Sequence, residues 1–204
     1  MTPTILFAKY SNKFDTITLL QSFVTKPAMT KIIIFVILSS IIFKISWPAL
    51  FNAGSRKFYR FFAFEFLLIL ILVNSGYWFF KPFSLFQIIS WVLLILSLFL
   101  VLPGLYRLYN QGKPTATANI ETTTKLVTSG IYKYIRHPLY SSLIFLGAGC
   151  FFKNTSLLAA SLFIVMAVFI YATALTEEKE NMLKFGADYA VYIKKSKIFV
   201  PFLF

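Results

Sequence analysis

The chain has 204 residues, of which 58% are hydrophobic, 19% are aromatic and only 13% are charged. This composition excludes an ordinary soluble domain of this size and indicates a protein that crosses a membrane several times. In a chain this apolar, the formal net charge of +13 predicts basic residues at the lipid surface rather than a nucleic-acid partner. A single cysteine and a single histidine exclude an internal disulfide and argue against a metal site.

Five apolar segments follow a mixed N-terminal stretch. Residues 1–28 show no signal-peptide pattern, and we expect them to be a dispensable or interfacial extension. The segments cover residues 31–50, 58–80, 84–109, 138–152 and 155–175. About twenty apolar residues cross the hydrocarbon as a helix, so only the fourth segment is short for a span. The sequence therefore predicts an all-α integral membrane protein with about five transmembrane helices and a C-terminal cytoplasmic helical tail.

Local features refine these helices. Pro103-Gly104 predicts a kink in the third helix, and the short link Lys153-Asn154 predicts a tight hairpin between the last two. Gly147-Ala148-Gly149 lies inside an apolar run, where small residues more often allow close helix packing than cofactor contact. The neighbouring Cys150 is expected to pack in the same way rather than to act as a nucleophile.

The distribution of lysine and arginine predicts the orientation. With the C-terminus inside, thirteen of the 20 basic residues lie on the cytoplasmic side and six lie outside. Because cytoplasmic loops carry the excess of these residues, this orientation is favoured. We expect a multi-pass protein of a prokaryotic plasma (inner) membrane, with residues 130–140 and the C-terminal tail on one cytoplasmic face.

Residues 130–140, GIYKYIRHPLY, form a polar, aromatic and cationic run between the apolar segments. The only histidine, His137, precedes Pro138, which suits the first turn of the helix that follows. Arg136 and His137 then lie at a helix N-terminus, whose free N–H groups and positive dipole end favour an anion. An aromatic and basic belt is also ordinary at a membrane surface, so this motif alone leaves both interpretations open.

A second motif lies near the C-terminus. Glu177 and Glu178 stand where the fifth helix is expected to leave the membrane, and carboxylates at that end oppose the helix dipole. A specific binding partner for the two carboxylates explains their position better than simple exposure to solvent does. Further on, Tyr189 and Tyr192 are one helical turn apart and can share a face.

Taken together, the two motifs resemble the isoprenylcysteine carboxyl methyltransferase family and the broader group that includes phospholipid N-methyltransferases. The resemblance covers about residues 102–204 and rests on Gly130-x-Tyr132-x-x-x-Arg136-His137-Pro138-x-Tyr140, the hairpin, Glu177-Glu178 and Phe185-Gly186-x-x-Tyr189-x-x-Tyr192. The chain departs from the family pattern at Ser142, Asn181 and Ser196-Lys197, where glycine, leucine and Val-Pro are usual.

The resemblance implies a membrane enzyme that binds S-adenosylmethionine without a Rossmann fold, in a cytoplasmic-side pocket of the last helices. With the apolar segments, we expect three transmembrane helices in residues 29–110 and a catalytic region, with the hairpin and a cofactor-binding tail, in residues 111–204. The cofactor-binding residues that the resemblance implies are Tyr132, His137, Pro138, Tyr140, Glu177 and Glu178, and the catalytic residues are Arg136 and Glu178.

The acceptor is expected to be a lipophilic small molecule or lipid that reaches the enzyme through the membrane. A prenylcysteine-like carboxylate needs no general base, and Arg136 can orient it by a bidentate contact. A phospholipid amine or another amine must lose a proton, for which Glu177 or Glu178 could serve. A third hypothesis, from another class, is a non-catalytic membrane scaffold of the same fold.

Overall fold

The computed structural model describes residues 28–48, 50–112 and 123–200. The expected extension therefore lies, but for its last residue, outside the described residues. The chain divides into two compact units, Met1–Ile41 and Ile42–Phe204. In the first unit, the described residues form the start of the apolar helix Ala28–Pro48. Most side chains of this helix are not covered by the rest of the protein. Such a helix is suited to a lipid environment.

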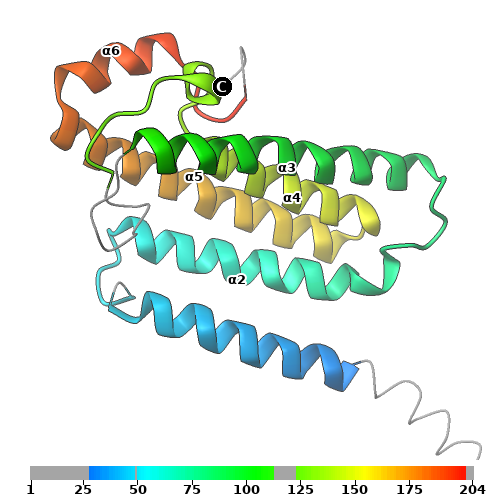
Figure 1. Cartoon of the computed structure of the whole chain (residues 1–204). Helices are drawn as coiled ribbons and strands as arrows, with labels where there is room; N and C mark the ends of the chain where they lie inside the picture. Colours follow the sequence, from blue (N-terminus) through cyan, green and yellow to red (C-terminus); the bar gives the residue numbers. More distant parts are fainter. Residues whose placement is uncertain (1–27, 49, 113–122, 201–204) are drawn as a thin grey trace, which may run out of the picture. The chain divides into compact units, whose positions relative to one another are not determined.

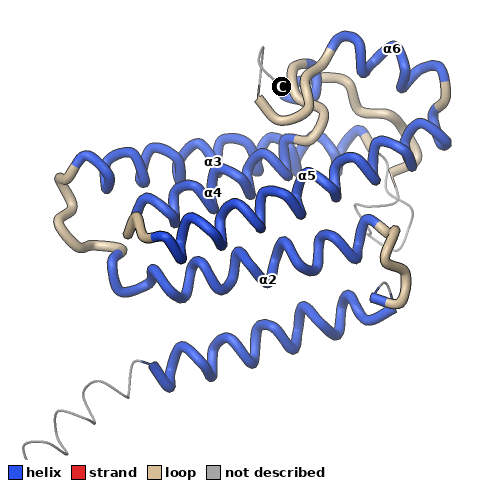
Figure 2. The backbone as a smooth tube through the Cα atoms, turned by 180° about the vertical axis from the view of Figure 1, so that it is seen from behind, coloured by secondary structure: helices blue, strands red, loops and turns tan. Residues whose placement is uncertain are grey.

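The second unit is a helical bundle. Its elements are α2 (Arg56–Asn74), η1 (Ser75–Tyr77), α3 (Leu85–Gln111), η3 (Gly130–Lys133), α4 (Pro138–Lys153), α5 (Leu157–Phe185) and α6 (Ala187–Lys195). Figures 1 and 2 show α2 to α5 lying side by side, with α3 packed mainly on α4 and α2 on α5. Among the described residues, four helical segments are long and apolar enough to span a membrane: Ala28–Pro48, Arg56–Tyr77, α3 and α5. Helix α4 is apolar but shorter. The expectation of an all-α multi-pass membrane protein is thus confirmed.

The helices begin where the sequence offers a cap. The side chains of Ser55, Ser84 and Ser156 accept hydrogen bonds from the first-turn N–H groups of α2, α3 and α5. These contacts satisfy donors that have no partner inside the helix. Pro138 occupies the first turn of α4, as predicted, and His137 is its N-cap residue. The link between α4 and α5 is short, which confirms the expected hairpin.

Helix α5 is longer than its apolar pattern predicted. The expected end was residue 175, but the helix continues to Phe185 and stops at Gly186, whose φ is +53°. Most of the intervening residues are good helix formers and none is glycine or proline, so only Gly186 provides a stop. Glu177 and Glu178 therefore lie inside a helix rather than at its end, which corrects the earlier placement.

Small residues bring the helices of the bundle together. Ser90 of α3 donates a hydrogen bond to the carbonyl of Gly149, at 2.7 Å. A Cβ atom at Gly149 would lie 2.8 Å from the side chain of Leu94, and one at Gly147 would lie 2.7 Å from Met166. Cys150 is fully buried beside them. The predicted packing role of this run is confirmed.

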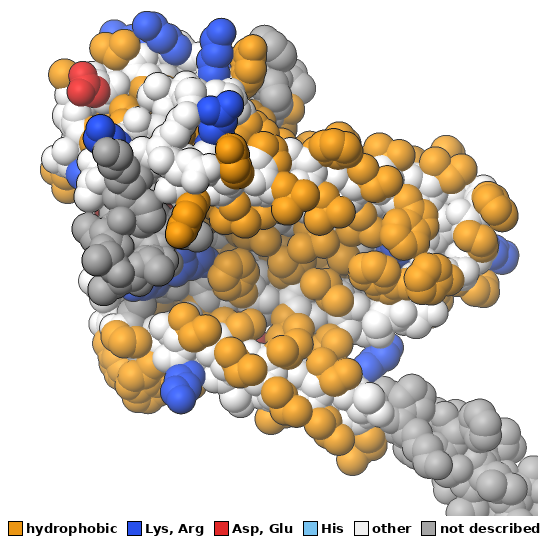
Figure 3. Space-filling view, in the orientation of Figure 1, with side chains coloured by type: hydrophobic (Ala, Val, Ile, Leu, Met, Phe, Trp, Pro, Cys, Tyr) orange, Lys and Arg blue, Asp and Glu red, His pale blue; other side chains and the backbone are white. Residues whose placement is uncertain are grey.

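The bundle has two chemically different ends. We call the site end the one where α2 and α4 begin and α3 and α5 end, together with α6 (Figure 1). The far end carries η1, the start of α3 and the turn between α4 and α5. Hydrophobic side chains cover the side of α3 that is in view in Figure 3, and lysine and arginine side chains gather near α6. This distribution fits a bundle surrounded by lipid with one strongly basic end.

The C-terminal tail returns to the first motif. The backbone N–H of Arg136 donates to the carbonyl of Lys197 at 2.7 Å, and the N–H of Lys197 donates to the carbonyl of Tyr134 at 2.9 Å. The backbone N–H of His137 donates to the carbonyl of Ile198. The two motifs therefore meet at one end of the bundle, as the charge distribution predicted.

Candidate active site

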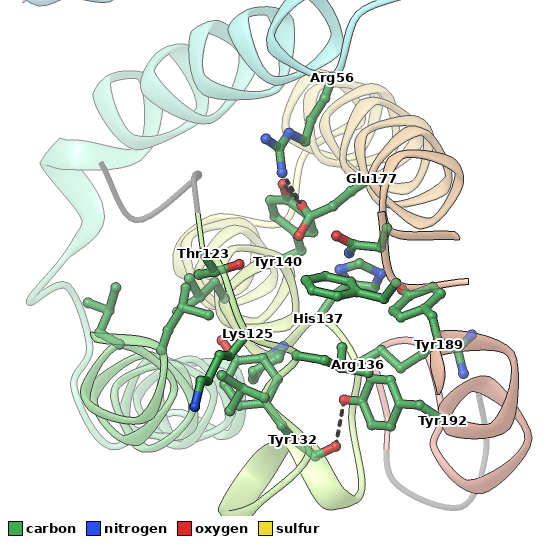
Figure 4. Close-up of a pocket in the computed structure, with 18 of the residues that line it drawn as sticks. Arg56, Thr123, Lys125, Tyr132, Arg136, His137, Tyr140, Glu177, Tyr189 and Tyr192 are labelled. Atoms are coloured by element: carbon green, nitrogen blue, oxygen red, sulfur yellow. Dashed lines mark hydrogen bonds and ion pairs between the residues drawn. The ribbon is translucent and has the colours of Figure 1, made fainter. Parts of the chain in front are cut away.

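A cavity of about 310 Å³ lies at the site end, which is within the size range of small-molecule pockets. Its walls come from α2, α3, α4, α5 and α6 and from residues 123–132 (Figure 4). Six of the predicted site residues line it: Tyr132, Arg136, His137, Pro138, Tyr140 and Glu177. The fold thus gathers most of the predicted site around one space, although the motifs are well separated in the sequence.

Glu177 is held at the wall of the cavity by two donors. The hydroxyl of Tyr140 donates to Glu177 Oε2 at 2.5 Å, and Arg56 Nη1 lies 3.2 Å from the same oxygen. Arg56 also reaches Glu180, with Nε at 3.4 Å from Oε2. Figure 4 shows Arg56 and Tyr140 converging on this carboxylate. The contacts fix the orientation of Glu177 beside the cavity.

Glu178 has a different position from its neighbour. Its Oε1 accepts a hydrogen bond from Arg136 Nε at 2.7 Å and lies 3.4 Å from His137 Nε2. Successive residues of a helix point about 100° apart, so the two glutamates cannot face the same space. Glu178 is not among the residues that line the cavity. Glu178 instead contacts Arg136 and His137, which do line the cavity.

Arg136 connects this charge cluster to the tail. Its Nη1 donates to the carbonyl oxygens of Ser196 and Ile193, the latter at 3.3 Å. The guanidinium therefore joins α5, through Glu178, to the end of α6. A lysine carries all its donors on one nitrogen and could not reproduce this set of contacts.

Three tyrosines form the aromatic part of the wall. Tyr132, Tyr189 and Tyr192 are buried, and the rings of the last two lie 5.8 Å apart, as their spacing on one helix face predicted. The hydroxyl of Tyr192 donates to the carbonyl of Tyr132 at 2.6 Å. Burial raises the pKa of Tyr189 to about 12, and burial also raises the pKa values of Tyr132 and Tyr192. All three are neutral aromatic groups at physiological pH.

Tyr189 Oη and His137 Nε2 are buried at the cavity wall and make no hydrogen bond of standard geometry within the described ranges, although His137 Nε2 lies 3.4 Å from Glu178 Oε1. An unsatisfied buried polar atom costs about 1–3 kcal/mol. The imidazole of His137 also stacks on the ring of Tyr140, at 5.5 Å between centroids. A polar ligand in the cavity would satisfy such atoms, which makes this region suited to binding.

The contribution of α2 to the cavity was not predicted from the sequence. Arg56, Arg60 and Phe64 line the cavity at intervals of four residues, which is one face of a helix. That spacing was visible in the sequence, but no motif connected it with the later segments. Asn181 and Phe185 of α5 also line the cavity, four and eight residues after Glu177.

Two of the three departures from the family pattern, Ser142 and Asn181, have different positions relative to the cavity. Asn181 faces the cavity, whereas Ser142 is buried and donates its hydroxyl to the carbonyl of Leu139 at 2.7 Å. Ser142 is not among the lining residues, so its hydroxyl does not narrow the space. Throughout the described residues, no three His, Cys, Asp or Glu side chains come together as a metal site requires.

Comparison with known families decides the broad activity. The sequence model of phospholipid methyltransferases matches residues 85–186, half of the chain. The chain belongs to the phospholipid methyltransferase family. This family includes the isoprenylcysteine carboxyl methyltransferases, so the resemblance found in the sequence is confirmed. No individually curated protein matches the chain. The protein is a multi-pass membrane methyltransferase.

The matched segment of this methyltransferase begins with the first residue of α3 and ends at the glycine that stops α5. Helices α2 and α6 lie outside it. Both nevertheless line the cavity, through Arg56 and Arg60 on one side and Tyr189 and Tyr192 on the other. The segment that matches the family model therefore contains only part of the candidate site.

Proposed function

We propose that this methyltransferase takes its methyl group from S-adenosylmethionine and transfers it to a lipophilic acceptor that enters from the bilayer. The observation that carries the proposal is the cavity in which Glu177, His137 and three buried tyrosines meet between apolar helices. Its walls combine charged, hydrogen-bonding and aromatic groups, and the cofactor contains partners for each kind.

The residues fit the cofactor group by group. The Glu177 carboxylate suits its ammonium group or ribose hydroxyls, and the tyrosine rings suit its flat base. His137 Nε2 and the Tyr189 hydroxyl, which are buried and make no hydrogen bond of standard geometry among the described residues, can bond to its polar atoms. Pro138 and Tyr140 complete the wall. The bound cofactor supplies a methyl group activated by a sulfonium.

The proposed roles of Arg136 and Glu178 follow from their positions relative to the same cavity. Arg136 lines the cavity and can orient an acceptor carboxylate, while Glu178 and two backbone carbonyls fix its guanidinium. Positioning an acceptor against the methyl carbon is the main requirement of such a transfer. We therefore assign Glu178 a positioning role through Arg136 and His137, and Glu177 direct contact with the cofactor.

Two acceptor classes fit this arrangement. The leading candidate is the carboxylate of a prenylcysteine-like lipid, which needs orientation but no base. The second is the amine of a phospholipid or other lipid, for which Glu177 is the glutamate at the cavity wall that can accept a proton. The family contains enzymes of both kinds.

We further propose that the site end faces the cytoplasm of a prokaryotic cell, because the cofactor is made there and the basic residues gather at this end. A reporter fused to the C-terminus tests this orientation. A fluorescent protein that folds only in the cytoplasm should be active in the fusion, and alkaline phosphatase, which needs the outside, should be inactive. The reverse pattern would contradict the proposal.

The cofactor is tested first by titration. Purified full-length protein in detergent is titrated with S-adenosylmethionine beside Glu177→Gln and the control Asp188→Asn, an exposed residue of α6 with the same change of charge. We expect saturable binding that is about 10–100-fold weaker in Glu177→Gln, from the loss of a charge-assisted contact of about 1.5–3 kcal/mol. The control should bind like the wild type. Absence of binding to folded wild-type protein would contradict the proposed cofactor.

The acceptor is tested by transfer of a labelled methyl group to N-acetyl-S-farnesylcysteine or to phosphatidylethanolamine in mixed micelles. A methyl ester is cleaved by alkali, whereas an N-methyl group is stable, so the product identifies the acceptor atom. Alkali-labile label on the farnesylcysteine supports the leading candidate. Cofactor binding without transfer to any acceptor would support the non-catalytic scaffold.

A further inference from the structure

One face of α2 lines the cavity with a charged and then an apolar side chain. Arg56, Arg60 and Phe64 follow one another at four-residue intervals from the first residue of the helix. At 1.5 Å per residue, this stripe extends about 12 Å inward from the site end. Arg60 is half-buried and stands between the ion pair of Arg56 with Glu177 and the ring of Phe64.

The apolar part of the wall continues on the neighbouring helices. Leu105 of α3 and Leu139 and Leu143 of α4 line the same cavity. The cavity is therefore charged near the first turn of α2 and apolar further along it. A molecule with a polar head and a hydrocarbon chain matches this change in a single orientation, with its head near Arg60 and its chain along Phe64 and Leu143.

The charge of the wall indicates the sign of that head. Among the described residues that line the cavity, four are lysine or arginine and Glu177 is the only carboxylate. Glu178 and Glu180 contact Arg136 and Arg56 from outside the lining, so the group as a whole carries one positive charge in excess. S-adenosylmethionine adds a net positive charge, because its sulfonium and ammonium outweigh its carboxylate. A cationic acceptor would meet repulsion here, whereas an anionic group would balance the excess.

We propose that Arg60 binds an anionic group of the methyl acceptor, a lipid carboxylate or phosphate, and thereby selects anionic amphiphiles. The proposal deepens the methyltransferase function and rests on it. Guanidinium matches carboxylate and phosphate with two parallel hydrogen bonds, so an arginine at this position recognises both groups. Helix α2, which carries Arg60, lies outside the segment that matches the family model.

The test compares matched amphiphiles in micelles of an uncharged detergent. Hexadecanoate, hexadecyl phosphate and hexadecanol are added to the purified full-length protein, and their affinities are read from the rise of the thermal unfolding midpoint. The variants are Arg60→Gln, Arg60→Lys and the control Lys57→Gln, an exposed residue of the same helix outside the cavity wall. The affinity for S-adenosylmethionine is measured separately in each variant.

We expect wild-type protein to bind at least one of the two anions about tenfold or more tightly than hexadecanol, the gain of a charge-assisted hydrogen bond. Arg60→Gln should lose this preference, Arg60→Lys should keep part of it, and Lys57→Gln should keep all of it. S-adenosylmethionine affinity should change less than about twofold, since the cofactor contacts other residues. The stronger of the two anions then identifies the acceptor as a carboxylate or a phosphate.

Several outcomes would overturn the proposal. Equal affinity of wild-type protein for hexadecanol and both anions would remove the anionic site. A preference that survives in Arg60→Gln, or that is lost equally in Lys57→Gln, would assign it to other charges or to the surface. Weaker cofactor binding in Arg60→Gln with the anion preference unchanged would place Arg60 at the cofactor. Failure of the proposed function is distinct, because it appears as absence of S-adenosylmethionine binding to the wild type.

Discussion

The two ends of the bundle each bury a cation, but they surround it differently. At the site end Arg136 meets a carboxylate and two carbonyl oxygens beside a cavity. At the far end Lys153 is buried against aromatic rings, with Nζ 3.6 Å from the ring centre of Trp91. It donates to Gln87 Oε1 at 3.1 Å and to the carbonyl of Trp78 at 3.3 Å.

The difference shows how a buried charge can serve folding or chemistry. The polar groups of the far end bond to one another, because Gln87 in turn donates to the carbonyls of Tyr77 and Lys153. This cluster fastens η1 to the ends of α3 and α4, and Lys153 is not a lining residue of the cavity. At the site end, by contrast, Arg136 borders the cavity together with Glu177, His137 and Tyr189. We infer that the far end stabilises the bundle and that the site end uses its charges for binding.

The largest effect is expected from Glu178→Gln. It removes the carboxylate that contacts both Arg136 and His137, and the loss of one partner of a largely buried ion pair costs about 2–3 kcal/mol here, below the full cost of a fully buried pair. The thermal midpoint should fall by roughly 4–12 °C, and S-adenosylmethionine affinity should fall as well. Thermal unfolding in detergent with cofactor titration measures both. The control Glu180→Gln changes a more exposed glutamate of the same helix, and an equal loss there would contradict the special position of Glu178.

Lys153→Met should separate stability from binding. The change removes a cation over an aromatic ring and leaves two acceptors unpaired, at a cost of about 2 kcal/mol. The midpoint should fall by roughly 4–8 °C while cofactor affinity stays at the wild-type value. Lys81→Met, an exposed lysine of the same end, is the control. If Lys153→Met weakens cofactor binding at an unchanged midpoint, the two ends do not divide these roles.

Arg136→Lys should loosen the docked tail without unfolding the bundle. Loss of one or two hydrogen bonds costs about 1–2 kcal/mol, so the amide hydrogens of His137 and Lys197 should exchange about tenfold faster. Turnover should fall more than cofactor affinity. Hydrogen exchange measured by mass spectrometry, with the exposed Lys133→Gln as control, tests this prediction. Unchanged exchange together with unchanged turnover would refute both the docking and the orienting role.

The smallest effect concerns the ionisation of Tyr189. Burial raises its pKa from 10.0 to about 12, so the folded protein holds this proton more tightly than the unfolded chain. The corresponding stability is complete below pH 10 and is lost as the pH rises from 10 to 12. Tyr189→Phe should therefore show a smaller fall of the thermal midpoint between pH 10 and 11 than the wild type. The exposed Tyr134→Phe should behave like the wild type, and identical slopes in all three proteins would contradict the prediction.

The sequence predicted the site best where its contacts are local. Pro138 begins α4 because it lacks an N–H group, and Tyr189 and Tyr192 share a face because they are one turn apart. The end of α5 was placed too early because the apolar pattern stops at residue 175, whereas the helix continues until a glycine allows it to end. Helix length there depends on the stop residue rather than on hydrophobicity.

The sequence by itself determined the class of the protein: long apolar runs must become helices in lipid, since the backbone can be satisfied there only within a helix or a closed barrel. It also determined, through two motifs, the family and six of the site residues that line the cavity. Only the tertiary structure decided that Arg56 and Arg60 join that cavity and that Glu177 and Glu178 divide between its wall and its support. These facts depend on how α2 packs against α5 and on which way each side chain of α5 points. Both are set by packing between segments far apart in the chain.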